Sequence, residues 1–424
     1  MKVEDVPQDL KYLKDSVCRD VAYAVDDDGK YQMVMSDGWE VKNDALDVAL
    51  EVEERGQQKE NTRKGDAQSD VVERLRVGDG TSGMLPLEHQ ATAHCENGAI
   101  STLLRYYGIS LSEPMIFGLA SGLFFVHMPF VKMNGMAVTA FRTFPGVLFK
   151  RITKSLGIKT TTRRYLNKEH AMRDLDRLIL ERQTPVGCVV GMYDLPYMPL
   201  EYRSRFNGHN ICVIGKDRLS GDYIVLDSNA TQKVTISRED LMTVRFAEGG
   251  TYPLMGQMYW IKSVPEQLPP LRPLILKSIR KTCWYMVSQP GFITFAGANG
   301  IAYLSRRIRT WEKTMGLRRA KQNLAQVIRM LEEIGTGGAG FRFIYGAFLQ
   351  EAAGVTGIDV LNDYSRRITE IGDLWREFAY KASRIIKRRA GENFTYDDLA
   401  DLLQHISELE HKFFTDLKRD VVAW

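Results

Sequence analysis

One cysteine, Cys95, stands where a helix is expected to begin. The residues that would form the buried face of this helix follow at helical spacing: Ala99, Ile100, Leu103, Leu104 and Tyr107. They predict a helix over residues 94–107 that ends at Gly108. A thiol in the first turn of a helix feels the positive end of the helix dipole, which stabilises the thiolate and activates a nucleophile. The competing interpretation is a buried structural cysteine, a common role for this residue type.

A cysteine nucleophile needs a base, and the neighbouring His94 cannot serve because adjacent residues on a helix do not face each other. His209 opens an apolar strand, and Asp227 ends the next strand along the chain. A hairpin turn centred near Arg218 would place the two roughly opposite each other, with Cβ atoms about 5 Å apart. The carboxylate would then fix the tautomer of the imidazole and stabilise its charged form. A register slip of one residue would point the two side chains to opposite faces.

The chain order Cys95, His209, Asp227 resembles that of papain-like cysteine enzymes, in which a thiol at a helix start faces a histidine on a sheet. In that architecture a glutamine upstream of the cysteine often helps to bind the oxyanion. Gln90 is a candidate for this role, although a plain loop residue explains it better. The backbone N–H of Cys95 is the alternative donor.

Several stretches of the chain together resemble the BtrH family, named for the butirosin biosynthesis acyltransferase. The matching residues are His94-Cys95, Leu103 to Gly108, Met115 to Leu119, Ser121 to Leu123, Pro185-Val186, Leu195 to Tyr197, His209, Val225 to Asp227, Ile334 to Gly338, and Phe341 to Ala352. The resemblance covers residues 84 to about 420. It implies a cysteine-peptidase-like fold and transfer of an acyl group from an acyl-carrier protein thioester to an amine. It also implies that Cys95 accepts the acyl group, His209 is the base and Asp227 orients it.

The elements that would hold these residues are typical of an α+β fold with an antiparallel sheet. Helices are expected at 94–107, 115–126 and 169–181, and strands at 186–193, 211–215, 223–227 and 257–261. They fall within residues 84–265, which the resemblance implies to be a cysteine-peptidase-like catalytic domain. Prolines at 269, 270 and 273 then mark the start of an all-helical domain, 266–424. Its helices are expected at 301–315, 319–334, 341–353, 360–387 and 397–414.

The first 83 residues lie outside this pattern. Residues 21–25 and 31–35 flank a turn at 26–29 and predict a β-hairpin, and Asn43 opens a short helix to residue 52. Residues 1–52 are therefore expected to form a small unit, followed by a polar linker over residues 53–83.

Composition sets limits on the class of protein. The chain has 424 residues, of which 44% are hydrophobic and 26% charged, and this excludes wholesale disorder. The net charge of +4 is too small to indicate nucleic acid as the partner. Five scattered cysteines without a C-x-x-C pair favour a reducing, cytoplasmic environment without a disulfide framework or a metal site. No signal peptide is visible, and the longest apolar run, 115–126, is too short to span a membrane.

Two further patterns leave alternatives open. Gly335, Gly337 and Gly340 match a dinucleotide fingerprint, but they follow a helix; a turn that needs positive φ or a helix N-terminus that cradles a phosphate explains them better. Basic clusters at 306–309, 318–321 and 387–389 are either solvated helix faces or a docking surface for an acidic carrier protein.

These observations predict an acyltransferase that works through an acyl-Cys95 intermediate without a cofactor, in specialised metabolite or lipid biosynthesis. The donor would be an acyl-carrier protein thioester and the acceptor a small amine. The alternatives are a cysteine peptidase or amidase of the same fold, in which water replaces the amine, and a non-catalytic module that binds a carrier or substrate.

Overall fold

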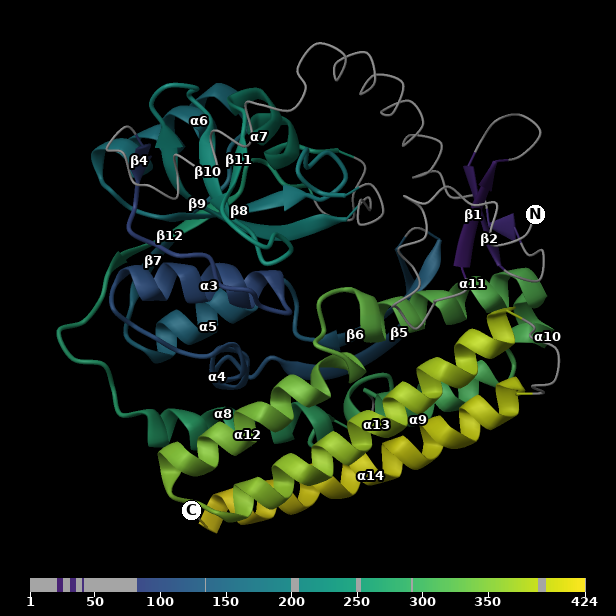
Figure 1. The fold of residues 1–424 in the computed structure, drawn as a ribbon. Coiled ribbons are helices and arrows are strands. Elements are labelled where there is room, and N and C mark those ends of the chain that lie inside the picture. Colours follow the sequence, from purple (N-terminus) through teal and green to yellow (C-terminus); the bar gives the residue numbers. More distant parts are fainter. Residues whose placement is uncertain are drawn as a thin grey trace. The chain divides into compact units, whose positions relative to one another are not determined.

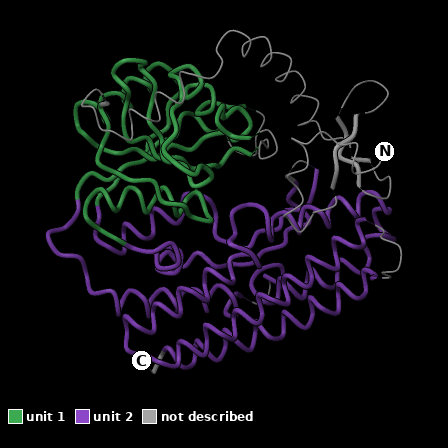
Figure 2. The backbone as a smooth tube through the Cα atoms, in the orientation of Figure 1, with its two compact units in different colours: residues 1–110, 159–263 green, residues 111–158, 264–424 purple. Residues whose placement is uncertain are grey.

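The computed structural model describes three short strands within residues 1–81, followed by residues 82–133, 135–199, 206–248, 253–290, 293–387 and 394–423. Figure 2 shows two compact units. Unit 1 comprises residues 1–110 and 159–263, and unit 2 comprises residues 111–158 and 264–424. The predicted domains, 84–265 and 266–424, are meant as parts of the chain that fold independently. Their boundaries stay a prediction.

Unit 1 is built on a seven-stranded antiparallel sheet with the order β11-β10-β9-β8-β12-β7, while β4 pairs with β9 outside this path (Figure 1). The strands are β4 (Ser82–Met84), β7 (Lys159–Arg163), β8 (Val186–Gly191), β9 (Asn207–Asp217), β10 (Tyr223–Leu226), β11 (Val234–Ile236) and β12 (Met258–Ser263). The predicted α+β class with an antiparallel sheet is thus confirmed, and the four predicted strands correspond to β8, β9, β10 and β12. The sequence missed β4, β7 and β11, which are short and not fully buried.

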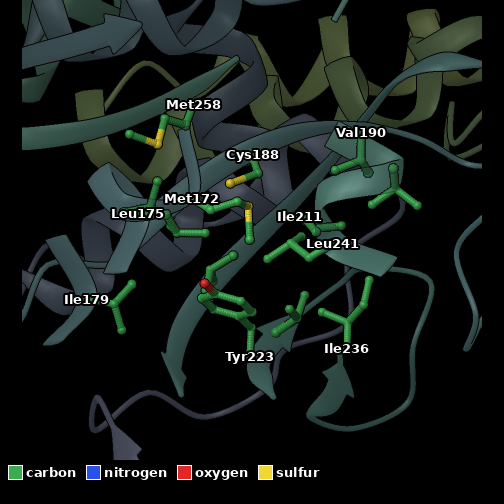
Figure 3. Close-up of a cluster of buried hydrophobic side chains, with 14 of the residues drawn as sticks. Met172, Leu175, Ile179, Cys188, Val190, Ile211, Tyr223, Ile236, Leu241 and Met258 are labelled. Atoms are coloured by element: carbon green, nitrogen blue, oxygen red, sulfur yellow. The ribbon is translucent and has the colours of Figure 1, made fainter. Parts of the chain in front are cut away.

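The two faces of this sheet are covered by different helices. One face packs on α6 (Lys168–Asp176), its π-helical extension Arg177–Glu181, and α7 (Arg238–Arg245), around the apolar cluster in Figure 3. On β9, Ile211 and Val213 belong to this cluster. Because side chains alternate along a strand, Asn210 and Cys212 point to the other face, against α3 (Cys95–Tyr106). Each fully buried aliphatic side chain of the cluster contributes roughly 1.5–3 kcal/mol to folding.

Unit 2 is helical apart from an antiparallel hairpin of β5 (Leu123–Met133) and β6 (Met136–Arg142). Its helices are α4 (Glu113–Leu119), α5 (Val147–Ser155), α8 (Leu271–Val287), α9 (Gly297–Ile308), α10 (Trp311–Met315), α11 (Leu317–Ile328), α12 (Arg342–Thr356), α13 (Val360–Lys387) and α14 (Tyr396–Ala423). All five helices predicted after residue 300 are present, although the first is broken into α9 and α10. The helix α8 was not predicted, and it begins directly after Pro270. None of the described helices is long and apolar enough to cross a bilayer.

The prediction of a single buried helix over residues 115–126 is wrong. The helix α4 ends at Leu119, Ser121 takes a left-handed conformation with φ of 50°, and the strand β5 begins at Leu123. Arg151 donates to the carbonyl oxygens of Ala120 and Ser121 at 3.2 and 3.0 Å, which satisfies the last turn of the helix. The run is buried as expected, but a short apolar segment does not itself distinguish helix from strand.

The two strands of the predicted N-terminal hairpin are confirmed. The strand β1 (Val21–Val25) pairs antiparallel with β2 (Tyr31–Met35), and β3 (Glu40–Val41) adds to β2. The expected helix over 43–52, residues 53–81 of the linker and Cys18 lie outside the described residues.

The glycine-rich segment 335–340 forms a tight turn before α12. Gly335, Gly337 and Gly340 all have positive φ, which confirms the turn that the sequence predicted as one alternative. The backbone N–H of Ala339 donates to a carboxylate oxygen of Glu332 at 3.2 Å. The group bound at this turn is therefore an anionic side chain of the protein itself, which leaves the phosphate alternative without support.

A buried ion pair joins α12 to α14 in unit 2. Arg342 and Glu410 are fully buried and form two parallel hydrogen bonds of 2.9 Å each. The indole N–H of Trp375 donates to the same carboxylate at 2.7 Å, and the Arg342 guanidinium lies 5.2 Å from the centre of its ring. Removing one partner of such a pair leaves an uncompensated buried charge.

We therefore expect Arg342→Met to lower the free energy of unfolding by about 3–5 kcal/mol. The double variant Arg342→Met with Glu410→Leu should lose less, because no charge is left alone. Urea denaturation followed by circular dichroism measures both. As a control, Arg309→Met removes exposed ion pairs with Asp397 and Asp401 and should cost about 1 kcal/mol or less. Equal losses for the Arg342 single and double variants would contradict this account.

Candidate active site

Cys95 is the first residue of α3, which confirms the helix start that the sequence predicted. The preceding residue, His94, is the N-cap and has an extended conformation with no side-chain cap. Ile100, Leu103 and Leu104 are fully buried and hold the helix against the sheet. Cys95 itself is half-buried. The thiol is therefore accessible to solvent and lies at the positive end of the dipole of a 12-residue helix.

His209, on β9, is the histidine that Cys95 contacts. Its Nε2 lies 2.8 Å from Oδ2 of Asp227, and a side-chain hydrogen bond links the ring to Cys95. Burial by itself would lower the pKa of His209, but the negative charge of Asp227 and the hydrogen bonds to Asp227 and Cys95 raise it to about 10. The imidazole is thus charged at neutral pH, and a cation beside a thiol stabilises the thiolate.

The carboxylate of Asp227 is buried and held by three donors. Oδ2 accepts from His209 and from the hydroxyl of Tyr197 at 2.9 Å, and Oδ1 accepts from the backbone N–H of Asn229 at 2.9 Å. Burial by itself would raise the pKa of Asp227, but the charge of His209 and these hydrogen bonds lower it. Burial and the nearby carboxylate also raise the pKa of Tyr197 well above 10, so Tyr197 stays a neutral donor.

A β-bulge places Asp227 on the same face of the sheet as His209. The register pairs Ile224 with Gly215, then shifts so that Val225 pairs with Val213 and Leu226 with Cys212. Continued by one residue, it sets Asp227 across from Ile211, two residues from His209. The sequence predicted that the two residues lie roughly opposite each other, and the register differs from a directly opposite pair by two residues. Both side chains share a face because the shift is even. Without the bulge Asp227 would lie across from Cys212, on the wrong face.

Asn210, the next residue on β9, gives Cys95 a second polar neighbour. Its Nδ2 lies 3.9 Å from the sulfur of Cys95 and donates to the carbonyl of Gly208 at 3.0 Å. Its Oδ1 accepts from the hydroxyl of Tyr259 at 2.8 Å, which fixes the orientation of the amide. Gly187 makes room for Tyr259, because a Cβ at this position would come within 2.3 Å of the tyrosine ring. An N–H donor is thereby held toward the thiol.

The segment before α3 is tied to the loop that follows β10. Nε2 of His89 lies 3.0 Å from the backbone oxygen of Asp227. Gly98 permits a close approach of the helix, since a Cβ there would meet the hydroxyl of Thr92 at 2.3 Å and Ser228 at 3.5 Å. These contacts set the position of Cys95 relative to Asp227. Gln90 is exposed in the same segment, and its predicted part in an oxyanion hole stays a prediction.

The structure thus brings together all three residues that the sequence singled out, while the catalytic roles assigned to them stay predictions. Sequence reasoning missed the parts of Asn210, Tyr259 and His89. It named Tyr197 only within the stretches that resemble the BtrH family. The adjacency of Asn210 to His209 was the one available signal. No group of three or more His, Cys, Asp or Glu side chains within the described ranges could hold a metal ion.

Two family models match the chain. Residues 94–228 match the model described as butirosin biosynthesis protein H, N-terminal, a range that includes Cys95, His209 and Asp227. Residues 239–417 match a model described as a domain of unknown function, DUF4872. No curated protein matches the chain.

The environment of the thiols leads to a prediction about their reactivity. At pH 7, Cys95 should react with iodoacetamide at least about a hundredfold faster than Cys188, Cys212 or Cys283, since those thiols are buried and burial raises their pKa values. Between pH 6 and 8 its rate should change little, whereas an ordinary thiol gains roughly tenfold per pH unit below its pKa. Peptide mapping of the folded protein by mass spectrometry measures both. Equal labelling of the four cysteines would contradict the prediction.

The charge of His209 depends on Asp227, which gives a second prediction. Asp227→Asn should bring the pKa of His209 below 6.5 and lower the alkylation rate of Cys95 at pH 6 by about tenfold or more. Because the pKa in the folded state, about 10, exceeds the ordinary 6.5, this group stabilises the wild type fully below pH 6.5. That contribution should be lost as the pH rises through about 10, and should be absent in the variant.

Histidine NMR titration and urea denaturation across this pH range test the second prediction. Tyr197→Phe serves as the matched control, because it removes one donor to Asp227 and keeps the carboxylate. It should shift the titration of His209 less than Asp227→Asn does. An unchanged titration in Asp227→Asn would show that the carboxylate does not set the charge of the imidazole.

Proposed function

Because residues 94–228 belong to the family of the butirosin biosynthesis protein H N-terminal domain, we propose that the chain is an acyltransferase working through an acyl-Cys95 intermediate. Membership of this family suggests a biosynthetic, acyltransferase-like role. The proposed donor is an acyl-carrier protein thioester and the proposed acceptor an amine. The observation that carries the proposal is the chain of contacts from Cys95 to His209 to Asp227. A thiol at a helix start and a histidine on an antiparallel sheet also support a papain-like fold.

In the first half of the proposed reaction, the thiolate of Cys95 attacks the carbonyl carbon of the donor thioester. The backbone N–H of Cys95 is the proposed donor for the oxyanion that forms, because the N–H groups of the first turn of a helix point toward its N-terminal end and favour negative charge there. As the tetrahedral species collapses, the bond to the carrier sulfur breaks. His209 gives its proton to the leaving thiolate, so that the carrier departs as a thiol and an acyl-Cys95 thioester remains.

In the second half, the now neutral His209 takes a proton from the amine as it attacks the acyl carbon. The bond to the Cys95 sulfur breaks, the amide leaves, and the thiolate and imidazolium are restored. Asp227 stays charged throughout and holds the ring through Nε2. Transfer from a thioester to an amine is downhill, so the site needs positioning and exclusion of water more than a strong base.

We expect the fate of the adduct to separate transferase from hydrolase. Intact-mass spectrometry should detect acyl-Cys95 when the protein is mixed with acyl thioesters on carrier proteins or on N-acetylcysteamine. The adduct of a transferase should persist for minutes alone and collapse within seconds when an accepted amine is added. His209→Ala should slow both formation and collapse by roughly 10²–10⁴-fold, the range typical of losing a general acid–base group.

Two controls accompany this assay. Cys95→Ala should give no adduct, and His170→Ala should react like the wild type because His170 lies exposed on α6. Rapid hydrolysis of the adduct, unaffected by any amine, would replace the transferase with the peptidase or amidase. Absence of an adduct with every thioester, amide and peptide tested would favour the non-catalytic binding module.

A further inference from the structure

Two helices of unit 2 carry an unusual concentration of positive charge. The nine residues of α5 and the 17 residues of α8 hold seven lysines and arginines and not one aspartate or glutamate. The whole chain has a net charge of only +4. The rest of the chain holds 50 lysines and arginines against 53 aspartates and glutamates, although α9 and α11 also carry local basic clusters.

The two helices present this charge together. Arg151 of α5 donates to the hydroxyl of Tyr285 on α8 at 2.7 Å, and its guanidinium lies 5.2 Å from the centre of the same ring. Lys281 of α8 loses basicity from partial burial and from the charges of Arg151, Lys277 and Lys154, which lower its pKa. Cations of both helices are thus close enough to repel one another.

Exposed side chains of the two helices form what we call the α5–α8 basic face: Lys150, Lys154, Lys277, Lys281 and Trp284. Lys277, Lys281 and Trp284 follow at spacings of four and three residues, which puts them in one stripe along α8. Trp284 is 47% exposed in spite of its size. No ion pair between described residues involves any of the four lysines.

We propose that the α5–α8 basic face is the surface on which an acidic carrier protein docks, an inference that rests on the proposed function. A patch of like charge without counter-ions destabilises the folded chain slightly and attracts an oppositely charged partner over a distance. An exposed tryptophan among cations is a typical anchor at the centre of a protein interface.

The apolar residues of the two helices argue against a membrane as the partner. Ile275, Leu276, Ile279 and Cys283 are buried in the core of unit 2, as is Ile152 of α5. A helix that lies in a bilayer surface needs a broad exposed apolar face, and a single tryptophan does not provide one.

The basic clusters singled out in the sequence are weaker candidates. Arg309 is bound to Asp397 and Asp401, and Lys321 is buried and donates to the carbonyl of Ile386. Arg388 and Arg389 lie outside the described residues. Arg306, Arg318 and Arg319 are exposed and provide a matched control set.

The test compares Lys154→Glu/Lys277→Glu/Lys281→Glu with Arg306→Glu/Arg318→Glu/Arg319→Glu. The donors are an N-acetylcysteamine thioester and the carrier protein that loads Cys95 fastest in the mass-spectrometric assay. We expect the lysine variant to load from the carrier about 10–100-fold more slowly at low ionic strength, because electrostatic steering is worth this much in association rate. The deficit should shrink in 0.5 M salt, at which charges are screened within about 4 Å.

Loading from N-acetylcysteamine should stay within about twofold of the wild type in both variants, since no carrier surface is involved. Equal loss of carrier loading in the two variants, or no loss in either, would overturn the docking inference while leaving the acyltransferase intact. Loading from the N-acetylcysteamine thioester, with no loading from any carrier protein, would also overturn the docking inference. No loading from either donor would instead refute the proposed function. Selective loss of binding to anionic lipid vesicles or to a DNA duplex, with carrier loading unchanged, would assign the face to that partner.

Discussion

The candidate site depends on one irregularity in the sheet, the β-bulge between Ile224 and Val225. Side chains alternate along a strand, so an odd shift of register exchanges the two faces and an even shift preserves them. Between Gly215 and Val213, β9 has one residue without a partner on β10, and this shift of register brings Asp227 to the face that carries His209. A regular ladder would set Asp227 across from Cys212, whose side chain points to the opposite face from that of Ile211, and would leave the histidine without its carboxylate. A bulge beside a functional site is common because it redirects one side chain at little expense to the rest of the sheet.

The charge balance of the site follows from this placement. Burial opposes the charged forms of both His209 and Asp227, so ionisation of either group alone would be disfavoured in this position. Each charge stabilises the other, and the hydroxyl of Tyr197 and the backbone N–H of Asn229 donate further hydrogen bonds to the carboxylate. The imidazolium can then lie beside Cys95 with its Nδ1 free of Asp227. Asn210, oriented by Tyr259, adds an uncharged donor to the thiol that does not change with pH near neutrality.

The sequence was most informative where local patterns decide the structure. The buried stripe from Ala99 to Leu104 located the start of α3, and with it Cys95, because helical spacing is a local property. The glycines at 335–340 indicated a turn for a similar reason, since positive φ is a property of single residues. The predicted hairpin around His209 was right in topology. Its register was predicted only roughly and differs by two residues from a directly opposite pair, because no feature of the sequence marks a bulge. The mistaken helix at 115–126 shows the same limit, as burial leaves no periodic signal in a short run.

The contacts that complete the site could not be predicted in this way. Tyr259 reaches Asn210 across 49 positions of sequence, and Tyr197 reaches Asp227 across 30. Their partners are set by the order of strands in the sheet, which places β12 and β9 on either side of β8, and by the absence of a side chain at Gly187.

The two units handle their charges in opposite ways. In unit 1 the charges of the site are buried and matched, so their free energies depend on geometry and hardly on salt. In unit 2 the pair of Arg342 and Glu410 is matched in the same manner, but the lysines of α5 and α8 are left exposed and unmatched. Repulsion among unmatched surface charges makes the fold slightly less stable. The exposed positions of these lysines are better explained by binding of a partner than by a contribution to the stability of the fold. Reaction at Cys95 and recognition of a carrier would then respond to different variables, the first to pH and the second to ionic strength.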